Sequence, residues 1–541
     1  MVGIVTGQGV GLERSSASVL GERGQVGSAT MGRGNDQVYV NAATGSLIIN
    51  RRDEFLVGRG PDLAYTQTYD SSGPPQYTWL QGVYHVLGAV TGTVNTAGST
   101  IMRGDGDGHN SLFSYDTARG AYVCTEGGGA YDELRYANGA WTWTDGDSRK
   151  TETYTTVSGV PGFHFVASLS DADGNVQTYS WYSNGTIQRI TNANGEYADF
   201  TQTNGLTTQI TTFSAGGVAA LTRMRYVWDS LRRLSSVTVD LSPGDHSVAD
   251  GKSYTTSYTY DGSSSRITSI VQTDGSRLDI AYTQSGSEYR VTKLTQTVSG
   301  ATARVTGLFY DLPTRTTTIT DPLGGATTLR YDSAGNLIQV THPVPASGAT
   351  APTVSFAYNS NGDVTSVTEA GRTTVYSYDS RGNMIQSRDA AGNTVTRTYG
   401  ARNELLSSTE YVVPDPDGAG AGAAGTPVTT RYAYDVENHL RFKVSGDGRV
   451  TEYRYNGDGT LAATLRYSAD LYNMAGLASS ASISEGALIS WAAGVPDKTT
   501  IERTDATYDF RGNLSTTTAY SKTLSDGSGD ANSPYTRIAY S

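Results

Sequence analysis

One short phrase recurs along the chain and constrains the fold more than any other feature. It reads RYDSAGNLIQ at 330–339, SYDSRGNMIQ at 377–386 and TYDFRGNLST at 507–516. The tyrosines of neighbouring copies are most often about 21 residues apart, and wider gaps hold insertions. Such a period is typical of a repeat architecture, in which each unit packs on its neighbours and the core lengthens with the chain.

Each position of the phrase has a physical reason. Four residues after the tyrosine stands only Gly or Asn, the residues that adopt a positive φ at low cost, and six residues after it stands an apolar residue. The pattern predicts a hairpin loop with a left-handed residue just before the returning strand. The clearest copies are Tyr331, Gly335 and Leu337; Tyr378, Gly382 and Met384; Tyr434, Asn438 and Leu440; and Tyr508, Gly512 and Leu514.

The strands around these turns carry tyrosines two residues apart, which places them on one face of the strand. A second turn, such as DAAGN at 389–393, separates consecutive units. Each unit is therefore predicted to be two strands and two turns. Weaker copies reach back to about residue 160, and one of them has Arg232 where Gly or Asn is expected. We predict an all-β fold, in which an antiparallel strip with a tyrosine-rich face twists and coils into a hollow shell.

Composition excludes several classes of protein. The net charge is −12 and there is no cluster of cations, which disfavours nucleic acid as a partner. No run approaches twenty apolar residues, so no membrane-spanning helix is expected. The N-terminus lacks a standard secretory signal, and the single cysteine, Cys124, has no partner for an intrachain disulfide.

Several stretches of the sequence suggest functional sites, but none has the residue spacing that metal binding or catalysis requires. GDGDGH at 104–109 lacks the full ligand spacing of a calcium loop, and similar strings recur in this chain as hairpin turns. No nucleophile elbow, phosphate-binding loop or zinc-binding helix motif is present. We therefore predict no enzymatic activity, no catalytic residue, no metal and no cofactor. The histidines are scattered, at His85, His109, His164, His246, His342 and His439.

We divide the chain into a Gly-rich leader at 1–34, an N-terminal β cap at 35–160 and the repeat shell at 161–541. Within the shell, residues 461–497 are rich in Ala and Leu and predict one short helical insertion. Ser482 and Glu485 fit a capping box, and Leu488, Ile489 and Trp491 are placed on one face. A plug packed over the shell wall is favoured over a peptide-docking element.

The repeated phrase resembles the YD repeat of the RHS (rearrangement hotspot) and teneurin-like family, most clearly at 331–337, 378–384 and 508–514. Residues 38–71 are similar to the segment that opens the repeat region in bacterial members. The resemblance implies a large hollow β-shell, which in bacteria commonly encloses a C-terminal toxin. The family's terminal segment with its aspartyl self-cleavage site is not found, so no cleavage residue is assigned and we expect the chain to be part of a longer polypeptide.

The leading functional hypothesis is a non-enzymatic shell, secreted or at the cell surface of a bacterium. Its partner would be its own C-terminal region or a toxin cargo. The alternative is an extracellular adhesion or carbohydrate-binding protein, with glycans or a cell surface as partner and tyrosines facing solvent. Self-association into filaments through open shell ends is a third hypothesis.

Overall fold

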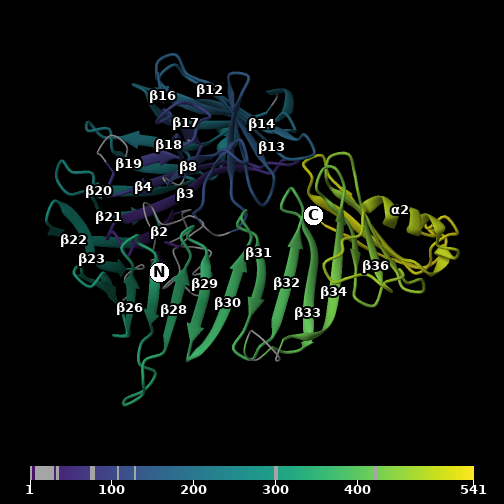
Figure 1. The fold of residues 1–541 in the computed structure, drawn as a ribbon. Helices are drawn as coiled ribbons and strands as arrows, with labels where there is room; N and C mark the ends of the chain where they lie inside the picture. Colours follow the sequence, from purple (N-terminus) through teal and green to yellow (C-terminus); the bar gives the residue numbers. More distant parts are fainter. Residues whose placement is uncertain are drawn as a thin grey trace.

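The computed structural model describes residues 3–5, 30–31, 36–73, 79–83, 85–106, 109–126, 129–217, 219–297, 303–415, 417 and 423–540 (Figure 1). Nearly every element is a β-strand, as a sequence rich in Thr, Tyr, Val and turn-forming Gly predicts. The strands form two sheets: a small N-terminal sheet, and one long strip that contains all the others. No helix among these residues is long and apolar enough to cross a membrane.

The N-terminal sheet is antiparallel except at its first strand, which pairs parallel to the second. Its strands are β1 (Gly3–Val5), β2 (Asp36–Asn41), β3 (Leu47–Leu56), β4 (Leu63–Asp70) and β5 (Trp79–Gln81).

The strip begins as a closed ring. Strand β13 pairs along one edge with β12, and on its other edge first with β6 and then with β14. The β6 pairing closes the ring, and the β14 pairing starts the rest of the strip. The ring strands are β6 (Val86–Leu87), β7 (Thr100–Gly104), β8 (Asn110–Asp116), β9 (Ala121–Val123), β10 (Glu133–Ala137), β11 (Ala140–Thr144), β12 (Thr151–Thr156) and β13 (His164–Ser170).

Beyond the ring, every strand pairs antiparallel with the next one in the sequence. We call β14 to β27 the first coil. Its strands are β14 (Val176–Trp181), β15 (Ile187–Thr191), β16 (Tyr197–Thr203), β17 (Leu206–Phe213), β18 (Ala220–Trp228), β19 (Leu234–Asp240), β20 (Ser253–Tyr260), β21 (Ile267–Gln272), β22 (Arg277–Ser285), β23 (Glu288–Thr297), β24 (Arg304–Asp311), β25 (Thr316–Thr320), β26 (Ala326–Tyr331) and β27 (Leu337–Thr341).

We call β28 to β40 the second coil. Its strands are β28 (Thr353–Tyr358), β29 (Val364–Glu369), β30 (Arg372–Tyr378), β31 (Met384–Arg388), β32 (Thr394–Tyr399), β33 (Leu405–Val413), β34 (Gly425–Tyr434), β35 (Leu440–Val444), β36 (Val450–Tyr455), β37 (Leu461–Tyr467), β38 (Glu502–Tyr508), β39 (Leu514–Tyr520) and β40 (Tyr535–Ala539). In Figure 1 the green strands of this coil stand in a row below the blue ring.

The largest core lies between the N-terminal sheet and the tyrosine-bearing face of the first coil. Val38, Leu47 and Tyr65 of the small sheet share one buried cluster with wall residues from Ile187 to Val340. Figure 1 shows the purple strands β2 to β4 among the teal strands of this coil. The ring has a separate core, which every one of its strands fills with at least one buried side chain. Burial of this apolar surface is the main stabilising term.

The α-helix α2 (Glu485–Gly494) packs on the opposite face of the strip. The cross-strand pair Tyr434 and Leu440 lies on the tyrosine face, so the adjacent pair Ala433 and Phe442 points the other way. The helix packs on that second pair through Leu488. The short helical insertion predicted from the sequence is confirmed. It covers the face of the strip that lies opposite the tyrosine face.

Two details of that prediction are wrong. Ser484, and not Ser482, caps the helix, because its hydroxyl accepts a hydrogen bond from the amide of Ala487 at 3.3 Å. Ile489 is 46% exposed and does not share the buried face of Leu488 and Ala492. The predicted fold class itself is confirmed: the protein is an antiparallel β-strip that coils into a barrel-like shell.

Candidate functional site

The repeat turn is a rigid joint. In the copy that starts at Tyr331, the carboxylate of Asp332 accepts hydrogen bonds from the amides of Ala334 and Asn336 at 2.8 and 2.9 Å. The Asn336 side chain donates back to Asp332 at 3.0 Å, and Gly335 has a φ of 88°. The same bonds recur at Asp379 with Asn383 and at Asp509 with Asn513.

The structure places the predicted repeat positions around this joint. The four residues expected in the left-handed region, Gly335, Gly382, Asn438 and Gly512, have φ between 74° and 88°. Arg232, which breaks the sequence pattern, still has a φ of 64°. The backbone of the turn therefore requires this conformation whatever residue stands there. Each tyrosine lies opposite its apolar residue across the hairpin, in the pairs Tyr331–Leu337, Tyr378–Met384, Tyr434–Leu440 and Tyr508–Leu514.

Sequence reasoning missed the Asn or other polar residue five positions after the tyrosine, which closes the turn. It also missed what the tyrosine hydroxyls do. In the second coil they donate to the main-chain carbonyl of the apolar residue in the preceding repeat, and so bind consecutive units together. The signal was present in the sequence, since 36 Tyr against 10 Phe is an unusual preference. The bonds are Tyr358 to Leu337, Tyr378 to Val364, Tyr399 to Met384, Tyr455 to Leu440 and Tyr508 to Leu461, at 2.7 to 3.1 Å.

Burial accompanies this ladder. It raises the pKa of Tyr378 to about 12. This hydroxyl therefore keeps its proton near neutral pH, and its bond does not depend on pH there.

The turns of the second coil dock on turns of the ring and the first coil, and we call this line of contacts the seam. At its start, the hydroxyl of Tyr131 donates to Asp363 at 2.7 Å, across 232 residues of sequence. The amide of Tyr131 also donates to the carbonyl of Arg381 at 2.8 Å. Further along, Asn403 donates to the carbonyl of Gly146 at 2.9 Å.

Further contacts of the seam follow in the same order along the two parts of the chain that it joins. Its later contacts are His439 with Asp173, Asn175 with the carbonyl of Asp458, and Arg511 with Glu196. The last pair is 315 residues apart in the sequence. Because both partners advance together, the strip closes on itself as a spiral and not as a flat sheet. Sequence reasoning did not find the seam, since its partners share no local pattern.

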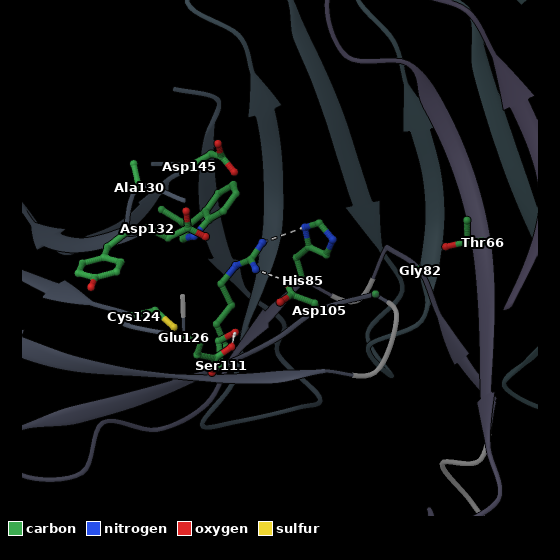
Figure 2. Close-up of a pocket in the computed structure, with 14 residues that line it drawn as sticks. Thr66, Gly82, His85, Asp105, Ser111, Cys124, Glu126, Ala130, Asp132 and Asp145 are labelled. Carbon is green, nitrogen blue, oxygen red and sulfur yellow. Dashed lines mark hydrogen bonds and ion pairs between the residues drawn. The ribbon is translucent and has the colours of Figure 1, made fainter. Parts of the chain in front are cut away.

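A polar cavity of about 330 Å³ opens beside the ring (Figure 2). Arg103 of β7 is buried and pairs with Asp105 and with Glu152 of β12, the latter at 2.9 Å. His85 contacts the same Glu152 at 2.5 Å. Burial opposes ionisation of Glu152, but Arg103 and His85 outweigh it and hold its pKa well below the usual range. The network ties together strands that are not neighbours in the ring.

The described groups around the cavity also include Ser111, Cys124 and Glu126. Burial raises the pKa of the Cys124 thiol, and a protonated thiol is a poor nucleophile. Figure 2 shows Cys124 and Glu126 close to Ser111, whose hydroxyl donates to Glu126 at 3.2 Å. Among the described residues no three His, Cys, Asp or Glu side chains are grouped to hold a metal ion. Part of the GDGDGH string, residues 107–108, lies outside the described residues.

Comparison with known proteins gives one family match. The RHS repeat model matches residues 310–346 and 358–394, which span the end of the first coil and the start of the second. No curated protein matches the chain.

Solved structures similar to the chain include TcdB2-TccC3 without its hypervariable C-terminal region, at 11% identity and a TM-score of 0.36 over 92% of this chain and 31% of that one. TcdB2-TccC3-Cdc42 matches at 11% identity and a TM-score of 0.38, over 89% of this chain and 30% of that one. A Photorhabdus luminescens Tc holotoxin pore matches at 12% identity and a TM-score of 0.38, over 92% of this chain and 30% of that one. The chain therefore spans less than a third of each of these proteins.

The family match falls on the copies of the turn that begin at Tyr331, Tyr358 and Tyr378. The same joint recurs outside the matched residues, at Asp509 with Asn513. The chain therefore contains RHS repeats at residues 310–346 and 358–394, and the same joint recurs beyond them.

Proposed function

We propose that this protein is a non-enzymatic wall that encloses or displays another part of its own polypeptide. The observation that supports the proposal most directly is the seam. A strip that docks back on its own earlier turns bounds a volume, whereas a strip used as a flat scaffold has no need of contacts between residues 232 to 315 apart.

The chemistry of the wall also favours enclosure. In the copy that begins at Tyr378, a ladder of backbone bonds joins the two strands, Asp379 closes the turn, and the tyrosine hydroxyl bonds to the preceding repeat. Such a wall gains rigidity with every added unit and requires no reactive centre. The enclosed partner would be the protein's own C-terminal region or a toxin cargo, and the shell would be secreted or held at a bacterial cell surface.

The test is protease protection of the complete polypeptide together with its image by electron cryomicroscopy. We expect a lumen bounded by the strip, and downstream residues that resist protease until the seam is disrupted. A wall without a lumen, or downstream residues cleaved as fast as an isolated peptide, would contradict the proposal. Recovery of the protein only from the cytoplasm would contradict the proposed location.

A second candidate function is carbohydrate binding at the tyrosine face. It is supported by the partial exposure of this face in the second coil, where Tyr376 and Tyr432 are half-buried, because aromatic rings stack on sugars. A glycan array combined with nitration of surface tyrosines tests it. Binding to a defined glycan that is lost in Tyr376→Ala and Tyr432→Ala would support this function. Protection of both tyrosines from nitration without a glycan hit would oppose it.

A further inference from the structure

One contact of the seam contains a group that titrates near neutral pH. His439 closes the turn that begins at Asp435, at the position where other copies of the repeat have an asparagine. In the copies at Asp332 and Asp509 the asparagine side chain donates to the aspartate of its own turn. His439 instead reaches out of its turn to the earlier coil.

Both ring nitrogens of His439 face carboxylates. Nε2 lies 3.0 Å from Asp173, in the turn between β13 and β14, and Nδ1 lies 3.1 Å from Asp435 of its own turn. The ring stacks on Tyr455 with a centroid distance of 4.4 Å. A neutral imidazole donates from one nitrogen only, so the protonated ring is required to donate to both carboxylates at once.

Charged groups from both coils surround the His439 ring. Asp171 belongs to the same turn as Asp173 and adds negative charge. On the side of the second coil, Arg402 donates to the main-chain carbonyl of Asp435 at 3.0 Å. At the neighbouring seam contact, Asp458 lies 3.9 Å from Arg59. His439 is the group that contacts both Asp173 and Asp435, so its protonated ring supplies the positive charge between them.

We propose that His439 is a proton-controlled latch of the seam: the imidazolium joins the two coils, and its deprotonation leaves one of Asp173 and Asp435 without a donor on the ring and loosens the wall at this point. The proposal concerns the opening of the strip and does not depend on what the shell encloses.

The expected direction with pH follows from the neighbours of each group. Burial lowers the pKa of His439, but the hydrogen bond to Asp173 and the charges of Asp173 and Asp435 outweigh it and raise the pKa above its ordinary value. The contribution of the ring is fully present below the pKa of a free histidine, about 6.5, and is lost as pH rises through the raised value. The latch also needs an ionised Asp173, and burial raises the pKa of this carboxyl, so its protonation weakens the contact at a higher pH than for a free aspartate.

The experiment is hydrogen exchange measured by mass spectrometry on the full chain at pH 6 and pH 8.5, corrected for the intrinsic exchange rate. We expect protection in residues 171–175 and 435–439 to fall by about two- to fivefold at the higher pH, as for the loss of a partly exposed ion pair. The seam contact between Arg511 and Glu196 is the internal reference, since an arginine does not titrate in this range. Equal protection of the His439 turn at both pH values would overturn the proposal.

His439→Asn is the matched variant, because it installs the residue that closes the turns at Asp332 and Asp509. It keeps the turn but removes the titrating group. We expect its protection to be independent of pH and to resemble that of the native chain at pH 8.5. Asp173→Asn removes the charged partner on the earlier turn, and protection of residues 435–439 at pH 6 should fall toward the native value at pH 8.5. If His439→Asn kept the pH dependence of the native chain, another group would be responsible and the latch would be refuted.

Discussion

The two coils of the strip are built from the same repeat but differ in how deeply they bury it. In the first coil, Tyr331 and Leu337 are 5% and 3% exposed. In the second coil the equivalent Tyr378 and Met384 are only half-buried. The difference comes from the N-terminal sheet, which shares a buried cluster with the first coil, whereas in the second coil Phe356 of β28 packs against that cluster only partly buried. The repeat therefore specifies a joint and a strand pairing, whereas burial depends on what else packs on the face.

The contact that fixes the N-terminal sheet to the first coil should have the largest effect when broken. Arg51 is buried and bonds to Asp36, Asp53 and the hydroxyl of Tyr258, at 2.5 to 3.0 Å. Arg51→Met should destabilise the protein by about 3–5 kcal/mol, because it leaves buried carboxylates without their cation. The measurement is the midpoint of urea unfolding.

The control for Arg51 is Arg449→Met in the second coil, where the arginine pairs with Asp447 at the surface. No measurable shift of the urea midpoint is expected for it. Equal shifts in the two variants would show that the sheet adds nothing to the first coil.

A pair of leucine truncations tests the difference in burial itself. Leu337→Ala in the first coil should cost about 2–5 kcal/mol, as for a fully buried leucine. Leu405→Ala occupies the same repeat position in the second coil, where the side chain is half-buried, and should cost about 1 kcal/mol. Urea unfolding of both variants gives the comparison, and a larger loss for Leu405→Ala would reverse our account.

Two glycines separate the conformation of the turn from its docking at the seam. Gly382 and Gly324 have φ of 83° and 88°. Alanine at either position should cost about 1–2 kcal/mol for its left-handed backbone. A Cβ at Gly382 would also meet Tyr131 at 2.5 Å, whereas Gly324 has open space.

We therefore expect Gly382→Ala to lower the melting temperature more than Gly324→Ala, and to increase hydrogen exchange in residues 129–131. The same melting temperature in both variants would show that a side chain at Gly382 does not disturb the seam.

Removing single hydroxyls should have the smallest effect. Tyr310→Phe breaks the bond from Tyr310 to the carbonyl of Val291, at 2.7 Å in the first coil, and should cost about 1 kcal/mol. Tyr399→Phe breaks the equivalent bond to Met384, at 3.1 Å in the second coil. Both side chains are half-buried, and the cost at Tyr399 should be the smaller because its hydrogen bond is the longer of the two. Urea unfolding checks both, and a larger cost for Tyr399→Phe would contradict this explanation.

Much of the fold could be predicted from local pattern. The strand pairs, the left-handed turn residues and the tyrosine face all depend on residues within one repeat of each other, so a period of about 21 residues reveals them. The capping residue of α2 was misassigned because Ser482 and Ser484 both precede the helix. Only the actual hydrogen bond from Ala487 distinguishes the two.

The sequence by itself determined the repeat unit, since a Gly or Asn with positive φ and an apolar residue two positions later suffice to specify a hairpin. Only the tertiary structure decided where the strip meets itself. The contacts of Tyr131 with Asp363 and of His439 with Asp173 join turns more than two hundred residues apart. They depend on the accumulated twist of many strands, a property that no single repeat contains.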